Sequence, residues 1–257
     1  MDQVRGSTNP EVQATAWMWM MMSTTLFVDK SGGGRIHAQL LHELFDDLDG
    51  VSSRFWASVT LAYLYRQLGV TSIGGVKQMG GCLTLLLAWI YGYFSIFRPH
   101  NPHQVGNGSR AAQSKPAAYT AVEGEVRLKK LRKDLDSLSP DDVVWEPFGK
   151  EMYKMVPKTI FTGWLAFRNF VEPYMPDRML RQLGYVQIIP MPTVVPQLAL
   201  RAMSGNNYKV EFSEVYAGNA WLRFPQSGCL ILSSYTRSTK AACADDYLYW
   251  FYHYFPS

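Results

Sequence analysis

The sequence is poor in cysteine and in charged side chains, and both shortages narrow the class of protein. Its 257 residues include three cysteines, Cys82, Cys229 and Cys243, which lie far apart and form no Cys-x-x-Cys pair. A disulfide framework and a zinc knuckle are therefore not indicated, and a reducing compartment fits best. Charged residues make up 18% of the chain, below the usual share of about a quarter. The net charge of +4 permits nucleic-acid binding without predicting it.

Neither a secretory signal nor a membrane hairpin is the favoured interpretation. Asp2, Arg5 and Glu11 precede the first apolar run, which is the wrong order for a signal peptide. The uncharged runs 12–28 and 79–97 reach the lower edge of a membrane span. Threonines lower the apolar character of the first run, and glycines and tyrosines lower that of the second. We therefore expect both runs to form buried core helices. A two-span membrane protein is the less favoured alternative.

Helical spacing of apolar residues dominates the first two thirds of the chain. It predicts a mainly α fold, a single globular multi-helix domain over 14–257 after a loose N-terminus at 1–13. A mobile loop is expected at about 98–118, and Gly69 is expected to end a helix. In the C-terminal third the pattern favours a few short strands or irregular segments. Helices are predicted at 14–28, 35–49, 54–69, 76–97, 125–138, 159–171 and 245–255, and strands or irregular packing at 208–212, 220–224 and 229–235.

The predicted helix around 123–138 carries both leucines and charges. Four leucines at spacings of three, four and three residues share one face, and five basic residues are mixed with four acids. A solvated helix face is the default interpretation of this mixture, and a surface that contacts phosphates is the alternative. The leucines are Leu128, Leu131, Leu135 and Leu138, and the candidate nucleic-acid contacts are Arg127, Lys129, Lys130, Arg132 and Lys133.

No cluster in the sequence predicts catalysis, a metal or a cofactor. Adjacent carboxylates on a helix point apart, and the pair Asp141 and Asp142 follows Ser139 and Pro140 as helix capping requires. The glycine-rich stretch 30–35 lacks the Gly-Lys-Ser/Thr ending of a phosphate loop. The other carboxylates and histidines that could in principle serve hydrolysis or bind a metal have no supporting pattern, and they are Asp46, Asp47, Asp49, His37, His42, His100 and His103.

The stretch 172–190, "EPYMPDRMLRQLGYVQIIP", combines charges, prolines and apolar residues. Pro176 and Asp177 suit the first turn of a short helix, and Gly184 suits its end. Asp177 and Arg181 stand four residues apart as a potential ion pair. For Arg178 we favour a buried structural pairing over a contact with a partner or phosphate. The candidate interaction or structural motif consists of Asp177, Arg178, Arg181, Gln182 and Tyr185.

Several tracts together resemble the plant mobile domain, a family related to transposon-borne sequences and to the maintenance-of-meristems proteins of plants. They include "LAYLYRQLG", "GVKQMGGCLTLLLAWIYGYF", "LRKDLDSLSPDDVVWEPF", the stretch above and "DDYLYWF". The resemblance implies a mainly helical nuclear domain linked to meristem maintenance, genome stability and transposon silencing, without established catalysis or cofactor. It implies nuclear proteins as partners and allows nucleic acid, and no membrane is expected.

Two features of the family bear on enzymatic activity. Its label "aminotransferase-like" finds no support in these residues, because no lysine stands in a recognisable cofactor context and no alternation of strand and helix is seen. Some relatives carry a fused metallophosphatase domain, whose Gly-Asp-x-His and Gly-Asn-His-Glu motifs are absent from this sequence. The start resembles a shortened family member, so a degenerate, transposon-derived protein that binds or processes nucleic acid is the alternative.

Overall fold

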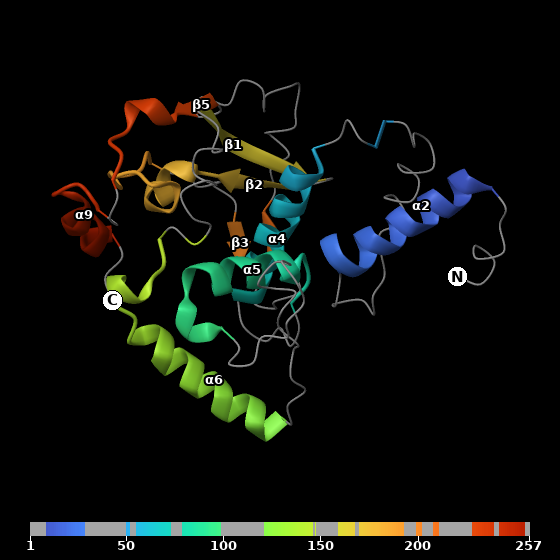
Figure 1. Ribbon diagram of the computed structural model, residues 1–257, viewed down its shortest axis with the longest axis horizontal. Coiled ribbons are helices and arrows are strands. Elements are labelled where there is room, and N and C mark those ends of the chain that lie inside the picture. Colours follow the sequence, from blue (N-terminus) through green and yellow to red (C-terminus); the bar gives the residue numbers. More distant parts are fainter. Residues whose placement is uncertain are drawn as a thin grey trace. The chain divides into compact units, whose positions relative to one another are not determined.

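The computed structural model confirms a mainly α fold with short strands toward the C-terminus (Figure 1). It describes residues 9–28, 50–51, 55–72, 79–98, 121–145, 147, 159–167, 170–192, 199–201, 208–210, 228–238 and 242–254. The predicted helix 35–49, the loop 99–118, the glycine-rich stretch, the segment 220–224, the four candidate histidines and Asp46, Asp47 and Asp49 lie outside those residues.

The longer helices lie mainly in the first half of the chain, and the strands follow them. The helical elements are α2 (Pro10–Met21), a π-helix (Met22–Leu26), α4 (Trp56–Ser72), α5 (Leu83–Tyr93), α6 (Ala121–Asp136), α9 (Tyr247–Tyr254) and 3₁₀ turns at Ser95–Phe97, Pro140–Asp142, Pro176–Leu183 and Leu232–Ser234. The strands are β1 (Thr159–Phe167), β2 (Phe170–Tyr174), β3 (Ala199–Arg201), β4 (Tyr208–Val210) and β5 (Gly228–Ile231). The sheet orders are β2-β1-β5 and β3-β4.

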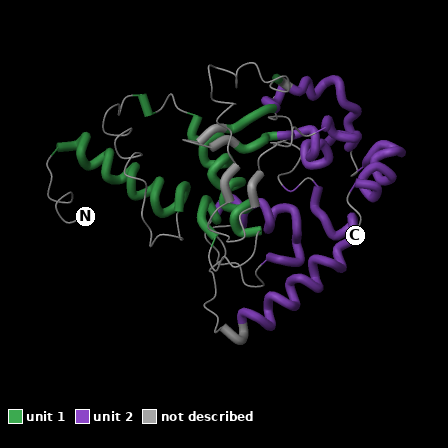
Figure 2. Tube along the Cα trace, turned by 180° about the vertical axis from the view of Figure 1, so that it is seen from behind, with its two compact units in different colours: residues 1–83, 163–174, 193–228 green, residues 84–162, 175–192, 229–257 purple. Residues whose placement is uncertain are grey.

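The chain divides into two compact units, each assembled from separate stretches of sequence (Figure 2). Unit 1 comprises residues 1–83, 163–174 and 193–228, and unit 2 comprises residues 84–162, 175–192 and 229–257. Each unit therefore depends on pairings between residues far apart in sequence. The domain boundaries expected from the sequence stay a prediction.

In unit 1, helix α2 starts as its sequence dictates but is not buried on all sides as expected. The Asn9 side chain accepts a hydrogen bond from the Glu11 backbone N–H at 2.9 Å, and Pro10 occupies the first turn. Trp17 and Met21 are exposed, because burial is concentrated farther along, where Met22 and Phe27 enter the core. The prediction of an all-round buried helix was wrong for α2.

The core of unit 1 forms where α4 meets the end of the first helical segment. Phe27 packs edge-on against Tyr63, with ring centroids 5.7 Å apart, and both are buried with Met22, Ala62 and Leu165. Edge-to-face packing of this kind adds to the burial of apolar area. Helix α4 continues past Gly69 to Ser72, so Gly69 does not end it. Packing of its apolar face outweighs the local cost of a helical glycine.

The stretch 159–171, predicted as a helix, instead forms the hairpin of β1 and β2. The strands pair antiparallel, from Gly163 opposite Tyr174 to Phe167 opposite Phe170. Threonine, isoleucine, phenylalanine and tryptophan fill β1, and such β-branched and aromatic side chains fit a pleated surface. Gly163 has φ 144°, which glycine adopts without strain. The prediction of a helix over 159–171 was therefore wrong, because this apolar run has the residue types of a strand.

In unit 2, α5 is shorter and less buried than the predicted helix 76–97. It covers Leu83–Tyr93, and Leu85 and Trp89 are exposed. After it, Phe94 forms an antiparallel bridge with Val143, and the Val144 N–H donates to the Tyr93 carbonyl at 2.8 Å. Within the described residues no helix combines the length and apolar character needed to cross a membrane.

Candidate functional site

The predicted short helix forms, and it begins a segment of unit 2 that buried polar contacts hold in place. The 3₁₀ helix Pro176–Leu183 ends at Gly184, whose φ of 80° is left-handed. The Tyr185 N–H then donates to the Leu180 carbonyl at 3.0 Å, and Leu180 is completely buried. Leu180, Tyr185 and Leu232 form the core cluster of this unit. We call residues 176–190 the hub segment.

Buried polar contacts hold the two ends of the hub segment together. The Gln187 side-chain N–H group donates to the backbone carbonyl of Asp177 at 2.7 Å and to that of Ile188 at 2.9 Å. The Asp177 carboxylate accepts from the Met191 N–H at 2.9 Å. The Gln187 backbone also donates to Ala242 and accepts from Ala244. The hub segment is thus closed on itself and tied to the strand-like residues 242–244.

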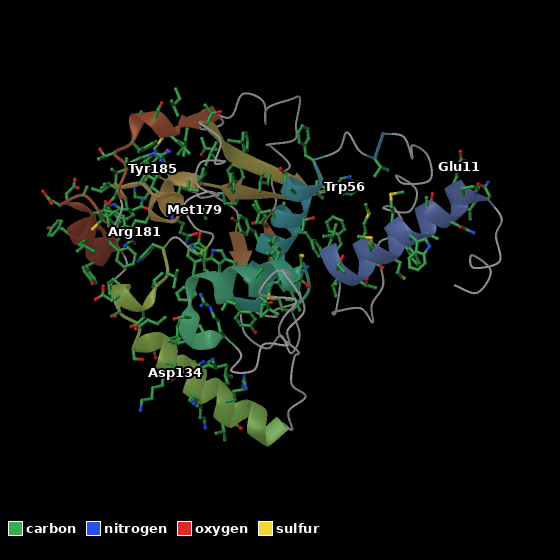
Figure 3. The ribbon with its side chains drawn as sticks, in the orientation of Figure 1. Glu11, Trp56, Asp134, Met179, Arg181 and Tyr185 are labelled. Carbon is green, nitrogen blue, oxygen red and sulfur yellow. The ribbon has the colours of Figure 1, made fainter. Side chains whose placement is uncertain are left out.

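Arg181 contacts aromatic rings in place of the predicted acidic partner. The guanidinium carbon of Arg181, the residue labelled in Figure 3, lies 4.6 Å from the ring centroid of Trp145 and 5.7 Å from that of Tyr247. Among the described residues Arg181 makes no ion pair with Asp177, whose carboxylate is occupied by Met191. Planar guanidinium groups favour such positions over ring faces. The predicted ion pair was therefore wrong.

The other predicted motif residues are placed differently from one another. Gln182 accepts a hydrogen bond from the Trp89 indole N–H at 3.4 Å. Tyr185 is buried, with the Arg237 guanidinium 5.5 Å from its ring centroid. Arg178 is exposed, so the burial predicted for it was wrong, while its pairing stays a prediction. The side chains of Arg181, Gln182 and Tyr185 contact residues that are distant in the sequence. The Arg178 side chain lies at the surface.

Replacing Arg181 by lysine is expected to lower the free energy of unfolding by about 1–2 kcal/mol, because an ammonium group cannot lie flat between two rings. Urea unfolding followed by circular dichroism measures this change. Arg178→Lys is the matched control, since Arg178 is exposed in the same helix, and it should change stability by less than about 0.5 kcal/mol. Equal effects of the two substitutions would contradict a special role for the contacts with Trp145 and Tyr247.

A buried carboxylate in unit 1 is the most perturbed titrating group in the described part of the chain. Glu172 on β2 is buried, and its Oε1 lies 3.9 Å from the Arg66 Nη1 on α4. Burial raises the pKa of Glu172 to about 7, and the charge of Arg66 opposes part of that rise. Burial also raises the pKa of the neighbouring Tyr65 and Tyr174 hydroxyls. This carboxyl group therefore gains and loses its proton close to neutral pH.

The candidate nucleic-acid contacts lie on α6, where all five basic side chains are exposed. Lys129 is 3.4 Å from the Glu125 carboxylate, and such an exposed pair contributes little to stability. Beyond the helix, a capping box starts the 3₁₀ turn Pro140–Asp142: the Ser139 N–H and hydroxyl both donate to Asp142 Oδ2. These bonds lower the pKa of Asp142, and they confirm capping as the role of this acid.

No three described His, Cys, Asp or Glu residues converge in a way that could hold a metal ion. The family model of the plant mobile domain matches residues 1–252. The chain belongs to the plant mobile domain family. Among the described residues, this domain therefore presents a packed hub, a buried carboxyl group and exposed helices.

Curated relatives of this plant mobile domain chain come from Arabidopsis thaliana. Protein MAINTENANCE OF MERISTEMS is 30% identical over 72% of the chain and 40% of its own length, and Protein MAIN-LIKE 1 is 29% identical over 68% and 35%. Serine/threonine-protein phosphatase 7 long form homolog is 29% identical over 69% and 14%. The chain thus spans well under half the length of these relatives. No solved structure matches it.

Several residues that contact the predicted motif, and both members of the buried pair, were not found from the sequence of this plant mobile domain. Gln187, Trp145 and Tyr247 are the partners that position the predicted motif, and Arg66 and Glu172 form the buried pair. A charged residue inside an apolar strand, as in "FVEPY", is the one signal in the sequence for Glu172. The spacing of the other residues carries no such signal, since their contacts join distant segments.

Proposed function

We propose that this plant mobile domain is a non-catalytic nuclear interaction module that binds other proteins through the exposed face of α9. The observation that carries the proposal is the exposure of Tyr249 and Tyr252, 79% and 65%, on one face of that helix. Leu248, exposed on the same face, adds apolar area. Tyrosine is enriched at the centres of protein interfaces because it combines a rigid ring with a hydroxyl group.

The anchoring of α9 supports its use as a rigid docking surface. Tyr247, at the start of the helix, is buried and lies near the Arg181 guanidinium. Its ring stacks with Phe251 at 6.2 Å and contacts Trp250 at 5.7 Å. A helix fixed on one side loses little conformational freedom when its other side binds. The hub segment therefore serves the proposed function by holding α9 in place.

Two further observations support the class of function. The polar groups of the hub segment hydrogen-bond backbone atoms, as structural groups do and as a general acid or base positioned for a substrate does not. The name of one relative, Protein MAINTENANCE OF MERISTEMS, supports a role in meristem maintenance. Genome stability, transposon silencing and nuclear localisation complete the proposal on the strength of family membership. A nucleic-acid-binding protein is the alternative, favoured by the exposed basic residues of α6.

Alanine at position 249 or 252 is expected to lower retention of nuclear partner proteins by about tenfold, the loss that truncation of one interface tyrosine commonly causes. The tagged full chain, purified from plant nuclei and analysed by quantitative mass spectrometry, gives the measurement. Tyr254→Ala is the matched control, because Tyr254 is equally exposed at 65% on another side of α9.

The same purification separates the two functions when half of each sample is treated with nuclease. Partners that survive nuclease and depend on Tyr249 and Tyr252 support the proposal. Partners that leave with the nucleic acid, or that are retained by every variant alike, overturn it. Nuclease-sensitive capture that is lost when Lys129, Lys130 and Lys133 are changed to glutamate would establish the alternative.

A further inference from the structure

The leucine stripe of α6 is exposed, although its spacing is that of a packed helix face. Leu128, Leu131 and Leu135 are 49%, 36% and 53% exposed. The helix has 16 residues, which gives a length of about 24 Å, and it lies along one edge of unit 2 (Figure 2). Spacings of three and four residues place these leucines at the a and d positions of a heptad repeat. Such a stripe is the seam along which a second helix packs.

The charges beside the stripe form a pattern that is complementary to itself. With Leu128 and Leu135 at a and Leu131 at d, the e positions are Glu125 and Arg132, and the g positions are Arg127 and Asp134. In an antiparallel pair of helices, e faces e and g faces g. Glu125 then meets Arg132 of the second copy, and Arg127 meets its Asp134. Twofold symmetry repeats both contacts.

The same register brings the apolar residues together. Layers that pair a with d place Leu128 opposite Leu131 of the second copy, and Gly124 opposite its Leu135. A parallel, in-register pair would instead set Arg127 against Arg132 of the other helix, which is repulsive. The antiparallel orientation therefore packs the leucines together and places each of the four charges opposite a charge of the other sign.

Gly124 is an independent observation that fits this arrangement. A glycine inside a helix is less stable than alanine there, yet a Cβ added at Gly124 would meet nothing within 4 Å. Packing within the described chain therefore does not require glycine there. In the antiparallel register, the empty space over Gly124 receives the Leu135 side chain of the second copy.

We infer that α6 is a self-association surface, on which the α6 of a second copy packs antiparallel through Leu128, Leu131 and Leu135, flanked by Glu125–Arg132 and Arg127–Asp134 contacts. The Glu125–Lys129 pair within one helix is exposed, so Glu125 exchanges partners at little cost. An interface formed by a single helix from each copy is small and belongs to the weak, transient class. The inferred pairing leaves Lys129, Lys130 and Lys133 at the b, c and f positions, away from the seam.

Sedimentation velocity of the full chain, from about 5 to about 500 μM, tests the inference. We expect a reversible dimer whose affinity falls as salt is raised, since exposed charges are screened. Leu131→Asp should abolish it. E125R and R132E should each weaken it by about tenfold, because each substitution creates two like-charge contacts. K133E is the matched control, a charge reversal at an f position, and should leave the affinity unchanged.

Mixing the two weakened variants supplies the decisive result. In a heterodimer of E125R with R132E, both e contacts again join opposite charges, so an equimolar mixture should recover the wild-type affinity. The double variant E125R/R132E should recover it alone. A chain that stays monomeric throughout, or a dimer whose affinity these variants do not change or restore, overturns the inference. Circular dichroism of each variant confirms that the fold is kept.

Discussion

Replacing Gln187 by leucine is expected to lower the free energy of unfolding by about 2–4 kcal/mol, because one buried and one partly buried backbone carbonyl lose their donor. Gln187 is almost completely buried, and its side chain donates to Asp177 at 2.7 Å and to Ile188 at 2.9 Å. Leucine has a similar volume but no N–H group, so packing is largely kept while the hydrogen bonds are lost. Urea unfolding, followed by tryptophan fluorescence and circular dichroism, measures the change.

Gln182→Leu is the matched control for this prediction. Gln182 lies in the same segment, and its carbonyl accepts one long bond, 3.4 Å, from the exposed Trp89 indole. Its loss should cost less than about 0.5 kcal/mol. If Gln187→Leu were as mild as Gln182→Leu, the carbonyls of residues 177 and 188 would have other donors or reach water, and the hub would not depend on Gln187.

The hub segment shows which part of a structure its own sequence determines. Pro176, Asp177 and Gly184 act on the backbone of their immediate neighbours, so the short helix and its left-handed end were predictable. Arg181 was assigned an acidic partner four residues away, but it lies over Trp145 and Tyr247. Those rings are 36 and 66 positions away along the chain. Local rules give no information about contacts over such distances.

The hairpin of β1 and β2 shows a different kind of failure. An apolar run with little alternation is compatible with a helix or with a strand buried on both faces. The β-branched and aromatic residues at the start of β1 favour a strand, and pairing with β2 satisfies its backbone groups. The same hairpin brings Glu172 next to Arg66 on α4. Because the strand was missed, the buried pair could not be foreseen.

Helix α6 and the capped turn that follows it were predicted more successfully because they are local. The leucine spacing indicated the helix, and Ser139, Pro140 and Asp142 indicated the capping arrangement that the structure contains. The exposure of the leucines was not predictable, since periodicity identifies a face without telling what covers it. The leucines have the spacing of a packed helix face but are exposed, and this difference leads to the inferred self-association.

Changing Glu172 to glutamine is expected to make stability less sensitive to pH. The folded pKa of Glu172, about 7, lies above its ordinary value of 4.5, because burial disfavours the carboxylate. Between these values the folded protein binds more protons than the unfolded chain, so the free energy of unfolding falls as pH rises. The contribution of Glu172 to the free energy of unfolding is fully present below its pKa in the unfolded chain. It is lost as pH rises through its pKa in the folded protein. The shift corresponds to roughly 3 kcal/mol over the whole window.

The quantity to measure is the difference in free energy of unfolding between Glu172→Gln and the natural chain, by urea unfolding at pH 5, 6, 7 and 8. It should move in favour of the variant by about 2 kcal/mol across this range, whatever its absolute value, because glutamine does not titrate. Differences in packing, which do not depend on ionisation, shift every point equally, so the slope isolates the titration of the carboxyl group beside Arg66. A flat line for Glu172→Gln would mean that water reaches this carboxylate in the folded protein.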